Sequence, residues 1–212
     1  ESKKSYIKSI ALKPSYAEAH NSLGVTLSQL GDFKKSKISY LKSIKLRPEY
    51  AEAHNNLGIL MQELGEIHDA KQCFEKAIKF KPNLAEAHRH LASIKTYVSE
   101  DKQFKEMSNL YNGNSISDQK RSNINFALAK AYKDLGNFEQ SFRHYKEGNA
   151  IRKKLLQYNI QKDIKRFDQI KSNNRKIENI NIQNDNLKSF SNPIFIIGMP
   201  RSGTTLVEQI IS

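Results

Sequence analysis

The residues best suited to chemistry form a glycine-containing turn near the C-terminal end of the sequence, from Gly198 to Thr205. An apolar run at 194–197 precedes the turn, and a helical pattern of apolar residues at 206–211 follows it. This order predicts a strand, a tight turn and a helix. Such a turn directs consecutive backbone N–H groups and the positive end of the helix dipole at one point, which favours an anion. We therefore expect a ligand that carries a phosphate group.

The side chains of the turn differ from those of a loop that binds nucleoside triphosphates. Gly198 and Gly203 have the spacing of a P-loop, but Thr204 stands where that loop has its lysine. This replacement, with no metal-binding carboxylate pattern nearby, disfavours a nucleotide kinase or hydrolase. We interpret Glu208, one turn into the helix, as a surface residue or an outer neighbour of the site. The positive charge is instead Arg201, whose planar guanidinium can bind two phosphate or sulfate oxygens at once.

The six residues 200–205, Pro-Arg-Ser-Gly-Thr-Thr, resemble the 5′-phosphosulfate loop of sulfotransferases that use 3′-phosphoadenosine 5′-phosphosulfate. The usual form of that loop is Pro-(Lys/Arg)-Ser-Gly-Thr-Thr after a hydrophobic strand. The cofactor-binding residues implied by the resemblance are Arg201, Ser202, Gly203, Thr204 and Thr205. The resemblance also implies that Arg201 is catalytic, since it would lie beside the sulfuryl group and stabilise its charge. It requires no metal, and the acceptor would be a hydroxyl or an amine.

A repeat with a period of 34 residues occupies the other end of the chain. The repeated positions are Pro14, Pro48 and Pro82 and, with the sequence Ala-Glu-Ala-His, residues 17–20, 51–54 and 85–88. Period and layout resemble the tetratricopeptide repeat, a helical hairpin that stacks with its neighbours into a solenoid. In the first complete repeat we predict helix A at 17–30, a turn at 31–32 and helix B at 33–46.

The apolar positions of these helices predict the core of the array. Gly24 and Gly58 leave room for the close approach of a neighbouring helix. The predicted buried stripe consists of Leu23, Leu27, Tyr40, Ile44, Leu57, Met61, Phe74 and Ile78. Residues 1–16 match only the second helix of a repeat, whereas the repeat that begins at Ala85 keeps helix A to about Tyr97 and then loses register.

These patterns divide the chain into four segments. Residues 1–98 form the repeat array, 99–171 a degenerate repeat with C-terminal helices, 172–192 a linker, and 193–212 the truncated start of a sulfotransferase domain. The predicted fold class is mainly α: a tetratricopeptide solenoid followed by the first strand, loop and helix of a P-loop-like α/β domain. Such repeats ahead of a sulfotransferase loop are a familiar combination in bacterial proteins. We interpret the chain as an inactive fragment whose catalytic base and 3′-phosphate site lie beyond residue 212.

The A helices predict a groove for a partner. Helix A positions that face away from the core line the concave side of such a solenoid. These include Asn21, Asn55, Asn56 and Arg89, and an asparagine offers both a donor and an acceptor to the backbone of an extended peptide. We expect a protein or peptide in this groove, and the alternative is that these side chains are simply solvated.

Composition and charge limit the possible partners. Hydrophobic residues make up 38% of the chain and charged residues 27%, as in an ordinary globular protein. The net charge is +13, and residues 143–176 contain eleven lysines and arginines against three acids. This basic stretch fits a solvated helix face or a positive approach for an anionic cofactor or an acidic acceptor. Nucleic acid is not expected, because no recognition motif or aromatic platform accompanies the charge.

Membrane and metal sites are not expected either. No apolar run reaches the roughly 18 residues of a spanning helix, and the expected location is the cytoplasm. A single cysteine, Cys73, allows no disulfide within this sequence and is expected to pack rather than react. His20, His54 and His88 hold the same repeat position a whole hairpin apart, so we predict no metal site.

Two functions remain open from the sequence. The first is a sulfotransferase that uses 3′-phosphoadenosine 5′-phosphosulfate and whose repeats bind the acceptor or a protein partner. The acceptor stays open among protein, glycan, lipid and small molecule. The second is a non-enzymatic adaptor, whose repeats bind partners and whose C-terminal segment is a vestige or binds a nucleotide without turnover.

Overall fold

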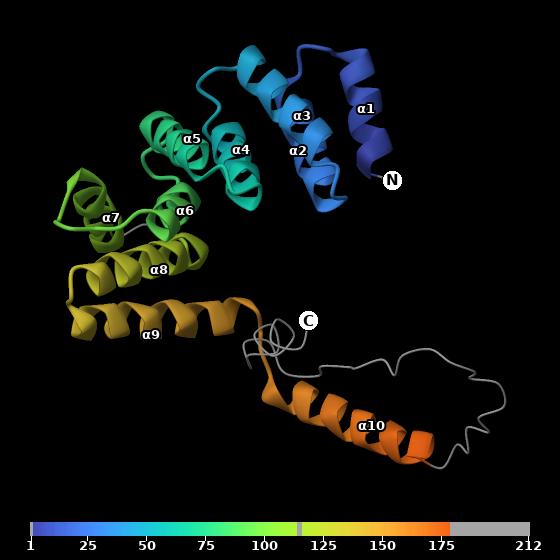
Figure 1. Ribbon diagram of the computed structural model, residues 1–212, viewed down its shortest axis with the longest axis vertical. Helices are drawn as coiled ribbons and strands as arrows, with labels where there is room; N and C mark the ends of the chain where they lie inside the picture. Colours follow the sequence, from blue (N-terminus) through green and yellow to red (C-terminus); the bar gives the residue numbers. More distant parts are fainter. Residues whose placement is uncertain (1, 114–115, 179–212) are drawn as a thin grey trace, which may run out of the picture. The chain divides into compact units, whose positions relative to one another are not determined.

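The computed structural model describes residues 2–113 and 116–178, and this part of the chain forms ten α-helices and no strand (Figure 1). The helices are α1 (Ser2–Leu12), α2 (Ala17–Gln29), α3 (Phe33–Leu46), α4 (Ala51–Glu63), α5 (Ile67–Phe80), α6 (Ala85–Ile94), α7 (Lys102–Asn112), α8 (Asp118–Asp134), α9 (Phe138–Leu155) and α10 (Ile160–Glu178). The chain divides into two parts, Glu1–Tyr158 and Asn159–Ser212. The first part holds α1 to α9, and α10 is the described portion of the second.

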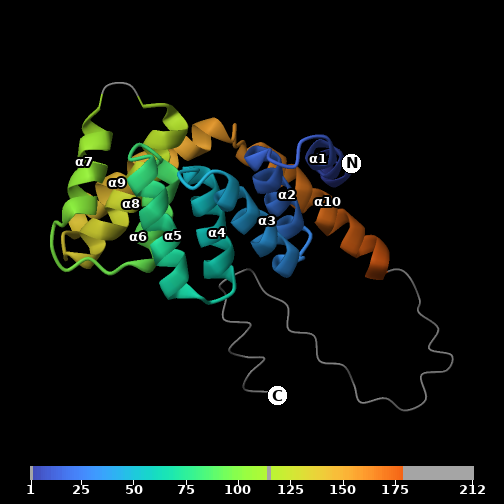
Figure 2. The same ribbon diagram turned by 90° about the horizontal axis from the view of Figure 1, so that it is seen from above.

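Consecutive helices of the first part pack as hairpins, α2 with α3, α4 with α5 and α8 with α9 (Figure 1). The first helices of the repeats, α2, α4, α6 and α8, contact one another in sequence and are called the A helices. The second helices, α1, α3, α5, α7 and α9, are called the B helices. Each B helix up to α5, and α7, also contacts the A helix that follows it (Figure 2). This is the stacking of a helical-repeat solenoid, in which each repeat contacts its neighbours.

Glycine residues end three of the A helices, α2, α4 and α8. Gly31, Gly65 and Gly136 have φ angles of +76°, +78° and +77°, in the left-handed region that side chains disfavour. The chain therefore leaves α2, α4 and α8 at a glycine and enters the next B helix a few residues later. Helices α2 and α3 agree with the predicted ranges 17–30 and 33–46 to within one residue.

The core contains aromatic rings packed directly on glycines. A Cβ atom on Gly24 would lie 2.6 Å from the Tyr40 ring, and one on Gly58 would lie 2.6 Å from the Phe74 ring. The close approach predicted at these glycines is thus present, and the approaching group is a ring from the B helix of the same repeat. The predicted stripe residues that are buried are Leu27, Tyr40, Leu57, Met61, Phe74 and Ile78. Leu23 and Ile44 are only partly buried.

The third repeat departs from the predicted pattern. Helix α6 ends at Ile94, so the predicted end near Tyr97 is three residues too late. Lys95 is extended, with φ −96° and ψ 144°, and the backbone N–H of Tyr97 donates to the carboxylate of Asp134 on α8 at 2.9 Å. The Tyr97 ring is only 1% exposed. Packing of this ring and its backbone against α8 therefore overrides the local helical pattern.

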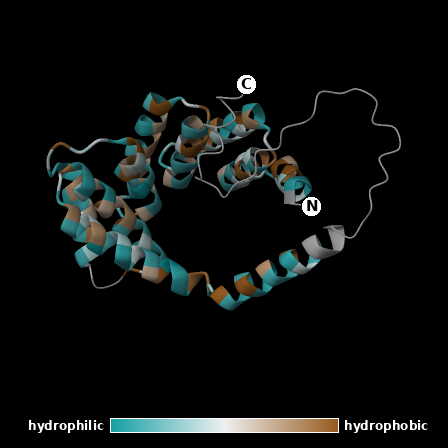
Figure 3. Cartoon of the chain, turned by 60° about the horizontal axis from the view of Figure 1, so that its bottom comes forward, coloured by the Kyte–Doolittle hydropathy of each residue, from teal (hydrophilic) through white to brown (hydrophobic). Residues whose placement is uncertain are grey.

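Helix α10 extends into the segment 172–192, which the sequence predicts as a linker, and it ends at Glu178. Its exposed apolar residues are Ile160, Ile164, Phe167 and Ile170. They recur every three or four positions, as brown bands along a mostly polar helix (Figure 3). Residues 179–212, with the predicted strand and turn, lie outside the described residues. Within the described ranges, no helix has the length and apolar character to cross a bilayer.

Candidate functional site

The predicted cofactor-binding residues, Arg201, Ser202, Gly203, Thr204 and Thr205, lie outside the described residues. The site that the geometry defines therefore belongs to the repeats. Across residues 2–113 and 116–178, no three His, Cys, Asp or Glu side chains form a group that could hold a metal ion. Burial raises the pKa of the Cys73 thiol, which favours the unreactive protonated form.

Polar side chains join neighbouring A helices across the predicted groove. Asn56 Nδ2 on α4 donates to Asn21 Oδ1 on α2 at 3.1 Å. His90 Nδ1 on α6 lies 3.0 Å from Asn55 Oδ1 on α4, and the acceptor oxygen assigns the proton to this ring nitrogen. Asn21 and Asn55 are 8% and 7% exposed. The structure thus brings these predicted groove residues together, and part of their hydrogen-bonding capacity holds successive repeats in register.

Arg89, the remaining predicted groove residue, links α6 to α8. Its Nη1 donates to Asn123 Oδ1 at 3.2 Å, and Asn123 Nδ2 donates to Glu86 Oε1 at 3.2 Å. The guanidinium carbon lies 5.6 Å from the centre of the Phe126 ring. Burial, and then the positive charge of Arg152, lower the pKa of Arg89, although an arginine remains charged at neutral pH. Arg89 is therefore a half-buried cation hydrogen-bonded to a neutral amide.

A pocket of about 370 Å³ lies between α5, α6 and α7. Its apolar wall includes Leu91, and its charged residues include three of each sign. Lys95 is ion-paired with Asp101, and Lys102 lies 3.7 Å from Glu106. Because the charges largely neutralise one another, this pocket has no marked preference for an anion or a cation.

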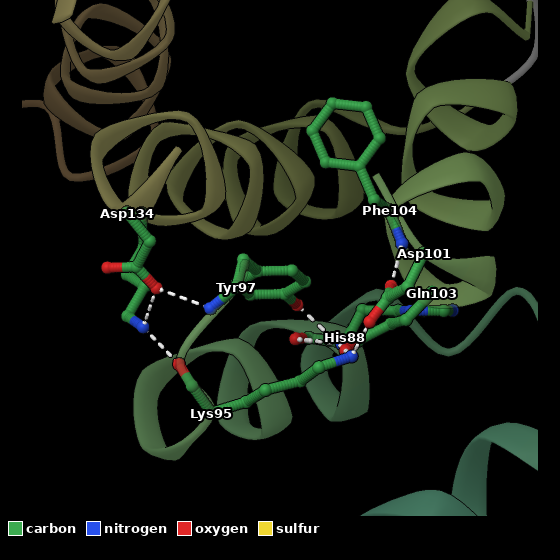
Figure 4. Close-up of polar contacts among 8 residues, drawn as sticks. His88, Lys95, Tyr97, Asp101, Gln103, Phe104 and Asp134 are labelled. Atoms are coloured by element: carbon green, nitrogen blue, oxygen red, sulfur yellow. Dashed lines mark hydrogen bonds and ion pairs between the residues drawn. The ribbon is translucent and has the colours of Figure 1, made fainter. Parts of the chain in front are cut away.

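A buried polar cluster fixes the loop between α6 and α7 (Figure 4). The Tyr97 hydroxyl donates to Gln103 Oε1 at 2.7 Å, and Gln103 Nε2 donates to the His88 carbonyl at 3.3 Å. Lys95 Nζ donates to the same Gln103 oxygen at 3.2 Å. Burial, with the nearby carboxylates of Asp101 and Asp134, raises the pKa of Tyr97. Tyr97 therefore serves as a protonated structural donor and not as a base.

The repeated histidines brace the loops before α2, α4 and α6. In each case Nε2 lies within hydrogen-bonding distance of a proline carbonyl six residues earlier. The pairs are His20 with Pro14 at 3.0 Å, and His54 with Pro48 and His88 with Pro82 at 2.8 Å. The spacing of these histidines predicted no metal site, but it was not recognised as the sign of this structural contact. The signal was the constant spacing of six residues between proline and histidine.

Burial of histidines makes the repeats sensitive to mild acid. Burial lowers the pKa of His54, His88 and His144, and burial with the charge of Arg89 lowers that of His90 to about 4. These side chains therefore bind protons less readily in the folded chain than in the unfolded chain, where a histidine has a pKa of about 6.5. Since the unfolded state then binds more protons, folding stability decreases as the pH falls through 6.5.

We expect the Tm of the chain to fall between pH 7 and pH 5, and His90→Gln to make that fall smaller. Glutamine keeps an N–H donor for Asn55 but takes up no proton in the unfolded state. Thermal unfolding followed by circular dichroism at pH 7, 6 and 5 measures the effect. His68→Gln, on the exposed side of α5, is the matched control. An identical pH dependence of Tm in wild type and His90→Gln would contradict the conclusion that His90 contributes to the acid sensitivity.

Comparison with known families identifies the repeats first. Tetratricopeptide-repeat models match residues 27–65, 51–84 and 122–154. The described helices and these matches make the chain a tetratricopeptide-repeat protein. The model of a sulfotransferase family matches residues 193–212, so the repeats are followed by a sulfotransferase-like segment. This second match covers twenty residues.

Individual proteins and solved structures are also similar to this chain. An uncharacterized protein from Aquifex aeolicus (strain VF5) is 28% identical over 125 residues, which are 56% of this chain and 15% of the relative. The chain thus matches only a small part of that relative's length. A crystal structure of MamA has a TM-score of 0.51 and 20% identity, covering 74% of this chain and 90% of that chain. A second MamA crystal structure has a TM-score of 0.49 at 21% identity, covering 74% and 84%. The first likeness shows a shared fold.

Proposed function

We propose that this chain contains the partner-binding repeats and the beginning of the catalytic domain of a sulfotransferase. The enzyme would transfer a sulfuryl group from 3′-phosphoadenosine 5′-phosphosulfate to a hydroxyl or amine of an acceptor. The observation that supports this most is the sulfotransferase match at residues 193–212, which include the motif at 200–205. The repeat matches support a function in protein interaction for the first part of the chain.

In this proposal the motif supplies binding and charge stabilisation. The backbone N–H groups from Ser202 to Thr205 bind the 5′-phosphate at the start of the following helix. The Arg201 guanidinium stabilises the negative charge that grows on the oxygens of the transferring group and of the leaving phosphate. The bound nucleotide supplies the activated sulfate. The acceptor proton passes to a general base that the proposal places outside residues 1–212.

The repeats would hold the acceptor or a partner protein on the face formed by the A helices. Holding a reactant close to the catalytic group converts a bimolecular encounter into an effectively intramolecular one. The polar side chains available there include Asn56 and Arg89, which are partly buried and anchored to the neighbouring repeats. Such anchoring lowers the entropy cost of binding a peptide.

The direct test uses a polypeptide that continues past Ser212 through a complete sulfotransferase domain, called here the extended protein. It is incubated with sulfur-labelled 3′-phosphoadenosine 5′-phosphosulfate and a mixture of proteins, glycans and lipids. Transfer of label to an acceptor above the level without enzyme is the expected result. Label that stays on the nucleotide, or appears only as inorganic sulfate, would count against the proposal.

A non-enzymatic adaptor is the second candidate. It is favoured by the described residues themselves, which contain a continuous repeat surface. An adaptor would bind the same partners whether or not the nucleotide is present, and it would transfer no label in the experiment above.

A further inference from the structure

A small pocket on the A-helix face combines a positive charge with aromatic walls. It lies between α6, α8 and α9 and has a volume of about 190 Å³. The residues that line it are Arg89, Ala92, Ser93, Phe126, Lys130 and Tyr145. This volume is below the range of about 300–1,000 Å³ typical of small-molecule sites. The pocket therefore suits one amino acid side chain better than a nucleotide or another cofactor.

Arg89 provides the positive charge that this pocket can offer to a ligand. Lys130 is ion-paired with Asp134 on its own helix, so its charge is already compensated. Arg89 donates to the neutral Asn123, and none of the ion pairs in the described part of the chain includes Arg89. A guanidinium carries five N–H donors, and a single hydrogen bond to Asn123 leaves donors for a ligand.

The surroundings of Arg89 hold it in place and limit its contact with water. The Phe126 ring lies 5.6 Å from the guanidinium carbon, and the rings of Phe126 and Tyr145 are 6.3 Å apart. Glu86 is connected to Arg89 only through Asn123. A partly desolvated cation beside aromatic rings attracts an anion more strongly than an exposed one does.

We propose that this pocket, the Arg89 pocket, receives an aspartate or glutamate side chain of an acidic peptide segment in a protein partner. The proposal rests on the partner-binding function proposed for the repeats and specifies the chemistry of that partner. Arginine and a carboxylate can form two parallel hydrogen bonds, and an adjacent apolar side chain would contact Phe126 and Tyr145.

Charge complementarity over the surrounding surface favours the same partner. Arg152 acts on Arg89 as a second positive charge. Helix α9, which contributes both Arg152 and Tyr145, carries five basic residues against two acidic ones. A positive surface of this kind increases the association rate of an acidic segment and disfavours a basic one.

The test measures binding of the 212-residue chain to an array of random peptides of about ten residues. We expect the bound peptides to be enriched in aspartate and glutamate. Arg89→Met, which removes the charge but retains a long side chain, should weaken their binding at least about tenfold. Lys105→Met removes one charge from the exposed side of α7 and should change binding less than about twofold. Arg89→Lys keeps the charge but lacks the planar guanidinium group. Its affinity for the acidic peptides should lie between those of wild type and Arg89→Met.

Other outcomes would overturn the proposal for the Arg89 pocket. Bound peptides without acidic enrichment, or an equal loss in Arg89→Met and Lys105→Met, would overturn the Arg89 pocket but leave partner binding by the repeats intact. No binding of any peptide would contradict the partner-binding function as well. A single-stranded RNA homopolymer that displaces the acidic peptides equally from wild type and Arg89→Met would indicate general polyanion attraction and overturn the proposal. Circular dichroism of each variant establishes that the repeats remain folded.

Discussion

Replacing Phe74 with alanine is expected to lower the free energy of unfolding of the repeats by about 3–5 kcal/mol. The ring is fully buried and packs on Gly58, where a Cβ would lie only 2.6 Å away. It also lies 5.4 Å from the His90 ring on the next A helix, so it connects two repeats. Its removal would leave a cavity at the interface on which the stacking of repeats depends. Urea unfolding followed by circular dichroism measures the loss.

Phe138→Ala is the matched control, because the Phe138 ring is 69% exposed on α9. Substitutions at exposed positions usually change stability by less than about 0.5 kcal/mol. Equal losses in the two variants would show that the glycine–aromatic contact is not a main source of stability in the array.

Replacing Arg201 with alanine in the extended protein is expected to lower the rate of sulfuryl transfer by about two to three orders of magnitude. Arg201 is the cation of the turn, since Thr204 stands where a P-loop has lysine. The repeats should remain folded, because α1 to α9 end at Leu155, far from this position in the sequence. The initial rate of label transfer to a fixed acceptor gives the comparison.

Two further variants make this result specific. Arg201→Lys keeps a positive charge but loses the planar guanidinium group, which can bind two oxygens at once. Its rate should therefore lie between those of wild type and Arg201→Ala. Glu208→Gln changes a residue that we interpret as lying outside the reacting groups, and its rate should stay close to that of wild type. An undiminished rate in Arg201→Ala would remove Arg201 from the catalytic residues.

The helix pattern of the repeats could be predicted because its signals are local. A glycine with a left-handed backbone, such as Gly31, ends an A helix whatever the rest of the chain does. The end of α6 could not be predicted in this way. It depends on the contact between Tyr97 and Asp134, which lie 37 positions apart. A sequence pattern contains no direct information about such a contact.

In the candidate site, too, the positions of the residues could be predicted but their contacts could not. Periodicity placed Asn21, Asn55, Asn56 and Arg89 on the A helices, which is where the structure has them. Whether their polar atoms are free depends on the neighbouring repeat. Asn21 pairs with Asn56 and Asn55 with His90, both at a separation of 35 positions. The separation exceeds the 34-residue period by one, because the next A helix presents the following residue to its neighbour.

The Arg89 pocket could not be derived from the repeat pattern. Two of its walls, Phe126 and Tyr145, come from the degenerate repeat, whose register differs from that of the first repeats. Only the surrounding positive charge was visible in the sequence, because Arg152, which acts on Arg89, belongs to the basic stretch 143–176. The structure adds the environment of Arg89. Among the residues that line the pocket, Arg89 is half-buried and its charge is not paired with a carboxylate, whereas Lys130 is paired with Asp134.

Thermal unfolding of the extended protein with adenosine 3′,5′-bisphosphate, the nucleotide that remains after sulfuryl transfer, tests the central claim most directly. A higher Tm is expected with this nucleotide, corresponding to about 2.7 kcal/mol of stabilisation at a concentration one hundred times its Kd. ATP with magnesium should give a much smaller change, because the turn at 200–205 lacks the P-loop lysine. Equal stabilisation by ATP with magnesium, or no change in Tm with adenosine 3′,5′-bisphosphate, would contradict the assignment of this turn to a sulfotransferase.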